Sequence, residues 1–209
     1  MKSVMKSVST QICEKITCGD CTLLVSKTAP KYKVPFKGYI YCCKAKSQWR
    51  YSGYEGAYEN SKGEIVYAQQ HIIGEFMCDE IIEWQYDKGH QYYVDYPDDC
   101  TSYFPYLKCH SEATGLKCSE IENYGKGKTL YGWHISDLKI YDTPKTLAEF
   151  YKCGAKSFEE LSDTEDLCSY CSRTGFCEGR WCDEAYQNYL DVDFALTRAP
   201  QSWQYVEEI

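Results

Sequence analysis

The chain has 209 residues, of which 44% are hydrophobic and 26% charged, with a net charge of −8 at neutral pH. This composition is typical of one globular domain, and the sequence lacks the apolar run of roughly 18 residues that a membrane span needs. The acidic balance and scattered Lys and Arg exclude a broad nucleic-acid footprint, because neutralising a phosphate backbone requires clustered basic residues. The segment Met1–Val4 lacks the apolar core of a secretory signal, so we expect a cytoplasmic protein.

The amino-terminal part predicts a strand, a helix and two further strands. Residues 1–8 alternate weakly between polar and apolar side chains, as a strand does. A short helix follows, with Ser9 or Thr10 as its N-cap and Gly19 at the position after its C-cap. Two apolar runs, at 21–25 and 36–43, predict the next strands.

The middle of the chain is less regular. Residues 44–70 form a polar and aromatic excursion punctuated by glycines. A strand is expected over 71–83, with a partner over 84–96 across a turn. Residues 118–124 predict a short helix that Gly125 closes.

Two aromatic and β-branched segments, 130–142 and 200–209, predict strands near the end of the chain. A terminus this apolar must be tied into a sheet, so we expect the last strand to belong to the core. Between them the region 151–197 carries little core-forming pattern. The sequence therefore predicts a single α+β domain over 1–209, dominated by strands, with insertions at about 44–70 and 151–197.

Clustered cysteines indicate a structural zinc site. Four of them, with metal-ligand spacing, are Cys168, Cys171, Cys177 and Cys182. Four thiolates suit tetrahedral Zn²⁺, and metal binding supplies folding free energy to an otherwise weakly patterned loop. Asp183 or Cys153 is an alternative ligand, and disulfides or individually buried thiols are the non-metal alternatives. A second, looser group is Cys100, Cys109, His110 and Cys118.

Five segments, in order along the whole chain, resemble the ASCH domain: Cys13–Ile16, Pro35–Cys42, Ile73–Phe76, Leu130–Asp142 and Pro200–Ile209. The form resembled is common in phages and Gram-positive bacteria and carries a cysteine-rich insertion at the same place. The resemblance implies a PUA-like mixed β-barrel with short peripheral helices and a cysteine-rich loop.

The site of ASCH domains lies at the turn from the first helix to the next strand, where the family has Gly-x-Lys-x-x-Glu-x-Arg. This chain has Gly19, Cys21, Leu24 and Ser26 at those positions, so only the glycine matches. A desolvated Lys can act as base or nucleophile, and the other two charged groups orient a polar ligand. The resemblance therefore predicts a ligand cleft at these four residues from which the family's charged catalytic set is lost.

Further site candidates lie elsewhere in the matching segments. The resemblance places Trp133, His134, Ser136 and Asp137 on a strand that enters the barrel, where they would contact a base or nucleoside. Cys21 with His134 is a catalytic candidate, as is a water held by Glu75 and His134. The structural alternatives are a buried Cys21 that packs as a small hydrophobe and a His134 that completes a hydrogen-bond network.

We expect an ASCH-type binding module that accepts RNA, a nucleoside or a modified base. The first alternative is a nucleoside amidohydrolase whose rebuilt site uses Cys21. The second is a phage-type factor that binds a protein partner through its acidic surface and the insertion at 44–70.

Overall fold

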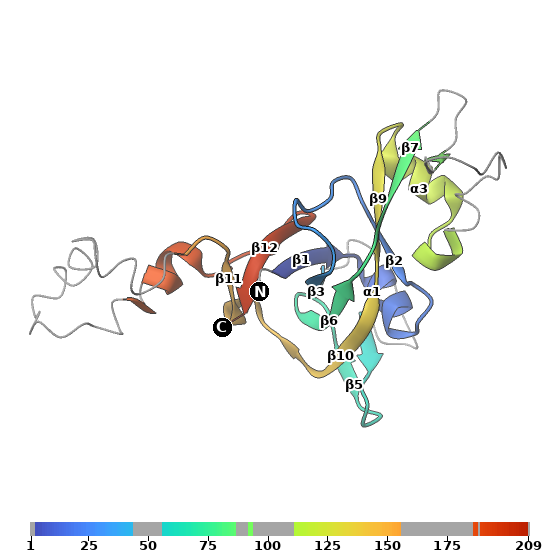
Figure 1. The fold of residues 1–209 in the computed structure, drawn as a ribbon. Coiled ribbons are helices and arrows are strands. Elements are labelled where there is room, and N and C mark those ends of the chain that lie inside the picture. The colour runs from blue at the N-terminus through green and yellow to red at the C-terminus, as the bar shows by residue number, and fades with distance from the viewer. Residues whose placement is uncertain are drawn as a thin grey trace, which may run out of the picture.

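The computed structural model describes residues 3–43, 56–86, 92–93, 111–155, 186–187 and 189–208 (Figure 1). Strands hold many more of these residues than helices do, and the helices are short, which confirms the predicted α+β class. Among the described residues, no helix has the length and apolar character needed to cross a membrane.

The larger sheet has six strands in the order β10-β6-β3-β1-β12-β11. Their bounds are β1 Ser3–Val8, β3 Phe36–Cys42, β6 Ile72–Cys78, β10 Ser136–Lys145, β11 Phe150–Lys152 and β12 Trp203–Glu208. β1 and β3 are parallel, whereas β12 runs antiparallel to both β1 and β11. Val206 on β12 is fully buried, so the prediction that the chain end belongs to the core is confirmed.

The second sheet has the order β2-β9-β7-β8, and β4 pairs with β5 in a separate hairpin. The bounds are β2 Leu23–Ser26, β7 Ile81–Tyr86, β8 Tyr92–Tyr93, β9 Leu130–His134, β4 Ala57–Glu59 and β5 Ile65–Tyr67. The helical segments include α1 Thr10–Thr17, α3 Cys118–Gly125, the 3-10 turn η1 Leu147–Glu149 and the π-helical turn η2 Leu190–Phe194.

Two strands predicted as continuous are each divided between the sheets. The segment 130–142 splits at Ile135, whose N–H donates to the Thr22 carbonyl at 2.8 Å, and Asp137 follows with a φ of 46°. The segment 71–83 splits after Cys78 in the same way, because β6 ends there and β7 starts at Ile81. At both breaks the chain passes from one of these two sheets to the other (Figure 1). One hydrophobic core lies between the two sheets.

That core takes side chains from both sheets. Ile40 and Phe76 come from the larger sheet, and Leu24 and Trp133 come from the smaller one. The opposite face of the larger sheet carries a second cluster around Tyr39. By their strand hydrogen bonds, the described residues of these two sheets form separate sheets packed around the core between them, not one continuous cylinder.

The helix α1 begins and ends as its sequence predicts. The Ser9 hydroxyl accepts a hydrogen bond from the Ile12 N–H, which is the N-cap contact. Cys18 is the C-cap, and Gly19 follows it with a φ of 80°, a conformation that glycine adopts without strain. This turn sets the start of β2 and therefore the position of the candidate cleft.

Both predicted insertions lie partly outside the described residues. The β4–β5 hairpin falls in the range 44–70, and β11 and η2 fall in 151–197. Residues 44–55 and 156–185 lie outside the described residues. The extent of the insertions therefore stays a prediction.

Candidate functional site

A lysine on β1 reaches the cleft region predicted at the helix-to-strand turn. Lys6 is 3% exposed, and its Nζ donates to the Ser26 hydroxyl at 3.0 Å and the Ser202 hydroxyl at 3.3 Å. The same Nζ lies 5.1 Å from the centroid of the Trp133 ring. An ammonium from β1 thus contacts two of the predicted site residues, Ser26 and Trp133.

The register of β1 explains why Lys6 points inward. Val4, Lys6 and Val8 alternate along the strand, and Val4 and Val8 belong to the core between the sheets. Lys6 pairs with Ile40 of β3, another residue of that core. Lys6 therefore takes a position that an apolar side chain would ordinarily fill.

A cavity of about 410 Å³ opens beside Lys6, between β1, β2 and the region of α3. Its polar lining consists of Lys6, Ser7, Ser9, Thr114, Glu120, Tyr124, Gln201 and Ser202. Its apolar lining consists of Val8, Ile12, Leu23, Leu24, Val25 and Leu116. We call this cavity the Lys6 cleft, and its size lies within the range of small-molecule sites.

Electrostatics at the base of the Lys6 cleft favour partial loss of the lysine proton. Burial lowers the pKa of Lys6 from 10.5 to about 8, an effect that the nearby Cys43 partly opposes. Among the described residues no carboxylate forms an ion pair with Lys6. In the part of the chain that the structure describes, the amine is thus held by two hydroxyls and an aromatic face rather than by a carboxylate.

The four residues of the helix-to-strand turn divide between this cleft and the core. Leu24 lines the Lys6 cleft, and Ser26 is fully buried against Lys6. Gly19 lies at the exposed end of α1. Cys21 is 2% exposed, its thiol points to the Leu23 carbonyl, and burial raises its pKa to about 11. A thiol in this state packs as a small hydrophobe and is a poor nucleophile.

Trp133 serves packing more than stacking on a ligand. It is fully buried, and its ring meets Phe36 and Trp203 edge-on at centroid distances of 5.8 and 5.7 Å. Its indole Nε1 has no hydrogen-bond partner among the described residues. Tyr124 on α3 is the aromatic side chain that lines the Lys6 cleft, and the Lys27 Nζ lies 4.7 Å from its ring centroid.

His134 belongs to a separate surface pair. Its Nδ1 lies 2.6 Å from an Asp79 carboxylate oxygen, and the His134 side chain is 41% exposed. The Ser136 hydroxyl donates to the Met77 carbonyl at 2.9 Å, and Asp137 is exposed. Hydrogen bonds, first from His134, hold the pKa of Asp79 below its ordinary value. Neither His134 nor Ser136 lines the Lys6 cleft.

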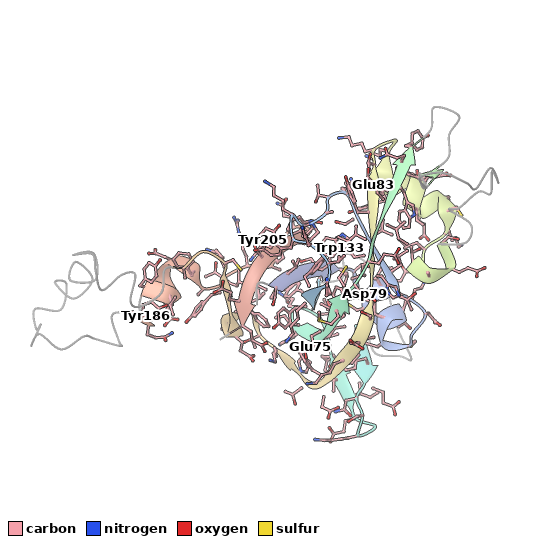
Figure 2. The ribbon with its side chains drawn as sticks, in the orientation of Figure 1. Glu75, Asp79, Glu83, Trp133, Tyr186 and Tyr205 are labelled. Atoms are coloured by element: carbon pink, nitrogen blue, oxygen red, sulfur yellow. The ribbon has the colours of Figure 1, made fainter. Side chains whose placement is uncertain are left out.

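Glu75 lies on the opposite face of the six-stranded sheet. It is paired with Tyr39, which belongs to the second cluster, whereas Lys6 is paired with Ile40 of the first core. Its carboxylate accepts from Lys37 at 2.8 Å and from the Tyr141 hydroxyl at 2.7 Å. Glu75 (labelled in Figure 2) thus faces away from the core between the sheets, and His134 pairs with Asp79 instead, so the structure does not bring Glu75 together with His134.

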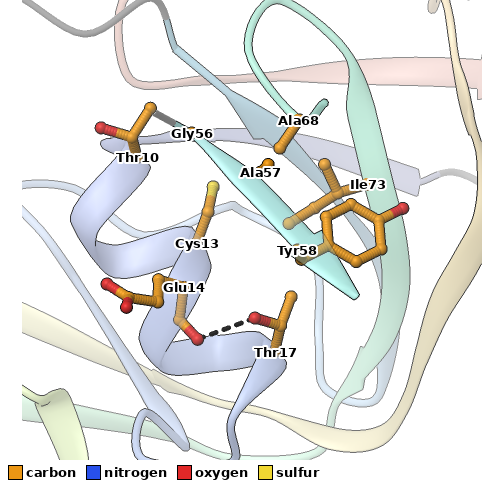
Figure 3. Close-up of a pocket in the computed structure, with 9 residues that line it drawn as sticks. All are labelled: Thr10, Cys13, Glu14, Thr17, Gly56, Ala57, Tyr58, Ala68 and Ile73. Atoms are coloured by element: carbon orange, nitrogen blue, oxygen red, sulfur yellow. Dashed lines mark hydrogen bonds between the residues drawn. The ribbon is translucent and has the colours of Figure 1, made fainter. Parts of the chain in front are cut away.

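Two other cavities are weaker candidates. One of about 10 Å³ lies between α1 and β4, where Cys13 and Tyr58 face it and Thr17 donates to the Glu14 carbonyl (Figure 3). It has room for a single water and no more. The other, of about 310 Å³, is formed mainly by the segment 196–201, which is only partly exposed, with Lys152.

The predicted zinc ligands Cys168, Cys171, Cys177 and Cys182 lie outside the described residues, as do Cys100, Cys109 and His110. Cys118 is described and half-buried at the start of α3. Among the described residues, no three His, Cys, Asp or Glu side chains gather as metal ligands. Both metal sites stay predictions.

Sequence reasoning missed Lys6 and Glu120, although a signal for Lys6 was present. A single Lys within the run Val4-Met5-Lys6-Ser7-Val8 stands in phase with two core valines. Such a lysine on a central strand is costly to bury and therefore marks a candidate site. For Glu120, the sequence shows only a polar residue in the first turn of a short helix.

No family profile and no curated protein matches the chain. In solved structures, the chain is similar to ASCH from Zymomonas mobilis, with 10% identity, a TM-score of 0.44 and coverage of 92% of this chain and 96% of that one. A mutant form of the same protein gives a TM-score of 0.45 at 10% identity, covering 93% of this chain and 100% of that one. At this identity the similarity carries no information about the site. The described residues themselves define a mixed α+β domain with a lysine-based cleft.

Proposed function

We propose that the chain is a binding module that accepts a nucleoside-like ligand, free or as an unpaired base of RNA, in the Lys6 cleft. The observation that carries this proposal is the buried ammonium of Lys6 at the base of a cavity of about 410 Å³. A ligand carbonyl or ring nitrogen would accept a hydrogen bond from Lys6 and so compensate its burial. The resemblance to ASCH domains supports the same class of ligand.

The cleft walls suit a flat ligand with polar edges. Leu24 and Leu116 offer apolar contact, and the Tyr124 ring offers a face on which a base can stack. The Glu120 carboxylate can accept from an exocyclic amine, although it already accepts from the Lys117 N–H at 2.8 Å. With a net charge of −8, the chain favours a small ligand or one base over a long nucleic-acid backbone.

A binding screen tests the proposal. Purified protein is titrated calorimetrically with nucleosides, modified nucleosides and short RNAs, and Lys6→Met and Tyr124→Ala are compared with the wild type. Loss of one charge-assisted hydrogen bond predicts that Lys6→Met weakens binding by about 10-fold or more. Lys139→Met is the matched control, because Lys139 is an exposed lysine near Glu75 on the other face of the sheet.

The outcomes of this screen separate the candidate functions. Binding that Lys6→Met and Tyr124→Ala abolish, and that Lys139→Met leaves intact, supports the Lys6 cleft. Absence of binding by any nucleoside or RNA contradicts the proposal and shifts support to a protein partner. Equal losses in Lys6→Met and Lys139→Met would show that only overall charge matters.

Hydrolysis of a modified nucleoside is the second candidate function, favoured by one observation: Lys6 and Glu120 line the same cavity. An amine of lowered pKa can act as a nucleophile or, when protonated, as an acid, and a carboxylate in the same cavity can act as the base. Turnover of an acylated cytidine is the assay. Activity lost in Glu120→Gln and kept in Cys21→Ala would place the chemistry in the Lys6 cleft, whereas the reverse would restore the Cys21 hypothesis.

A further inference from the structure

The partners of the Lys6 amine are hydroxyl groups. Ser26 and Ser202 both lie within hydrogen-bond distance of Nζ. A carboxylate would hold the proton on the lysine, but a hydroxyl accepts from an ammonium and donates equally well to a neutral amine. The site therefore accommodates both protonation states without loss of hydrogen bonds.

Lys37 provides the contrast within the same molecule. Its Nζ lies 2.8 Å from the Glu75 carboxylate, and although its partial burial lowers its pKa, hydrogen bonds to Glu75 and Tyr39 outweigh this, so the net pKa is raised. Burial lowers the pKa of Lys6 instead. At neutral pH a much larger fraction of Lys6 than of Lys37 is thus a neutral amine, the nucleophilic form.

We infer that Lys6 is a nucleophilic amine that condenses with a small aldehyde or ketone in the Lys6 cleft to form a reversible imine. The inference rests on the cavity beside the amine, on its hydroxyl partners and on the missing ion pair among the described residues. It goes beyond ligand recognition by hydrogen bonds. The chain would capture a carbonyl compound covalently rather than only bind it.

The reaction balances without an oxidant or a second substrate. The lone pair of neutral Nζ attacks the carbonyl carbon, a C–N bond forms and the C=O π pair moves to oxygen, which takes a proton. In the resulting carbinolamine Nζ has given up one proton, and the hydroxyl takes a second proton from water and leaves as water. The nitrogen lone pair closes the C=N bond, and Nζ returns its remaining proton to the hydroxide so formed. Net, one C=O bond and the two N–H bonds of the amine become one C=N bond and one water. The hydroxyls of Ser26 and Ser202 are placed to exchange protons with Nζ.

The cleft walls favour a neutral, largely apolar carbonyl compound. Apolar side chains form much of the lining, including Ile12, Leu24 and Leu116. Glu120 adds a carboxylate to the same lining, which disfavours an anionic ligand such as a keto acid. An aromatic aldehyde, with its ring against these side chains and Tyr124, fits this chemistry best.

Reductive trapping tests the inference. The full chain is incubated at pH 7.5 with benzaldehyde and sodium cyanoborohydride, and the benzylated lysines are located by peptide mass spectrometry. Because burial lowers the pKa of Lys6 to about 8, a sizeable fraction of its amine is neutral at this pH, and we expect Lys6 to react at least about 10-fold faster than the exposed Lys139. The rate at Lys6 should rise with a midpoint near pH 8, set by its burial and by the facing groups Cys43 and Glu120.

Two variants keep the test decisive. Lys6→Arg retains the charge and should abolish the fast adduct, while Lys139→Arg should leave it unchanged. If the folded protein, shown by cooperative melting, is benzylated at Lys6 no faster than at Lys139, the inference is wrong. The proposed function is tested separately. If nucleosides bind but Lys6 is unreactive, the proposed function holds and the imine inference fails. If Lys6 is reactive but no nucleoside or RNA binds, the imine inference holds and the proposed function fails.

Discussion

Lys6 on β1 and Trp133 on β9 belong to different sheets, yet the lysine Nζ lies 5.1 Å from the centroid of the tryptophan ring. Trp133 in turn meets Trp203, which is paired with Lys6 across β1 and β12. The ammonium thus lies where the two sheets face each other and an apolar side chain would be cheaper to bury. Its retention at this position is why we place function in the adjoining cleft.

Replacement of Lys6 by Met should stabilise the protein at neutral pH. Holding the buried ammonium costs on the order of 3 kcal/mol when its pKa falls from 10.5 to about 8. The folded state binds its proton less tightly than the unfolded state, so this cost is complete below pH 8 and is relieved as pH rises from about 8 to 10.5. We expect Lys6→Met to be about 1–3 kcal/mol more stable at pH 7.

Urea unfolding of the wild type and of Lys6→Met at several pH values checks this. The stability difference between them should shrink between pH 8 and pH 10.5. Taking the difference cancels the titration of other groups. A difference that stays constant over this range would show that Lys6 is not a buried ammonium.

Cys21 should resist alkylation in the folded protein, whereas Cys18 should react. Burial raises the pKa of Cys21 to about 11, and its side chain is almost fully covered, but Cys18 lies at the exposed end of α1. Because the thiolate is the reactive form, iodoacetamide at pH 8 should label Cys18 alone in this segment until the chain unfolds. Tandem mass spectrometry distinguishes the two sites. Rapid labelling of Cys21 under native conditions would revive its catalytic role.

Glu75 should stabilise the fold at pH values above the pKa that it has in the unfolded chain. This stabilisation should be lost in acid. Burial raises the pKa of Glu75, but hydrogen bonds from Lys37 and Tyr141 and the charges of Lys37 and Lys139 outweigh this, so the net pKa is lowered. A carboxyl group with a lowered folded pKa contributes stability that is lost as pH falls below about 4.5. We expect Glu75→Gln to cost about 0.5–1.5 kcal/mol at pH 7 and less at pH 3.

Glu83→Gln is the matched control for that variant, because Glu83 is an exposed glutamate on β7. Its change in unfolding free energy should stay within about 0.5 kcal/mol at both pH values. Equal effects of the two substitutions would contradict a stabilising network around Glu75.

The cysteine-rich segment should hold zinc. If Cys168, Cys171, Cys177 and Cys182 are the ligands, elemental analysis of the purified chain should find about one zinc per molecule. The double variant Cys168→Ser with Cys171→Ser should lose the metal, and Cys18→Ser should keep it. A metal-free wild type that is fully folded would refute the site.

The sequence predicted those elements whose formation depends on neighbouring residues. The Ser9 cap and Gly19 define α1 within a few residues, and the alternation in residues 3–8 identifies β1. The sheet breaks at Ile135 and after Cys78 were not predictable, because they depend on which sheet the next residues join. Long-range pairing, rather than propensity, decides those boundaries.

Sequence reasoning named some of the residues that lie around Lys6, and their role in ligand binding stays a prediction. Leu24, Ser26 and Trp133 were expected near a cleft, and they do surround Lys6 or line its cavity. Placing Glu75 beside His134 required knowledge of sheet register, and the register puts Glu75 on the other face. A shift of one residue moves a side chain to the opposite face, so sequence alone could not separate these arrangements.

The pKa of Lys6 is the most direct test of a buried, cleft-lining ammonium. The protein is prepared with ¹³C-labelled lysine, the Cε resonance of Lys6 is assigned by its loss in Lys6→Arg, and its chemical shift is followed from pH 6 to pH 11. A midpoint near 8 is predicted from its burial. A midpoint at or above the ordinary lysine value of 10.5 would place the amine in water, and the cleft described here would then lack its central group.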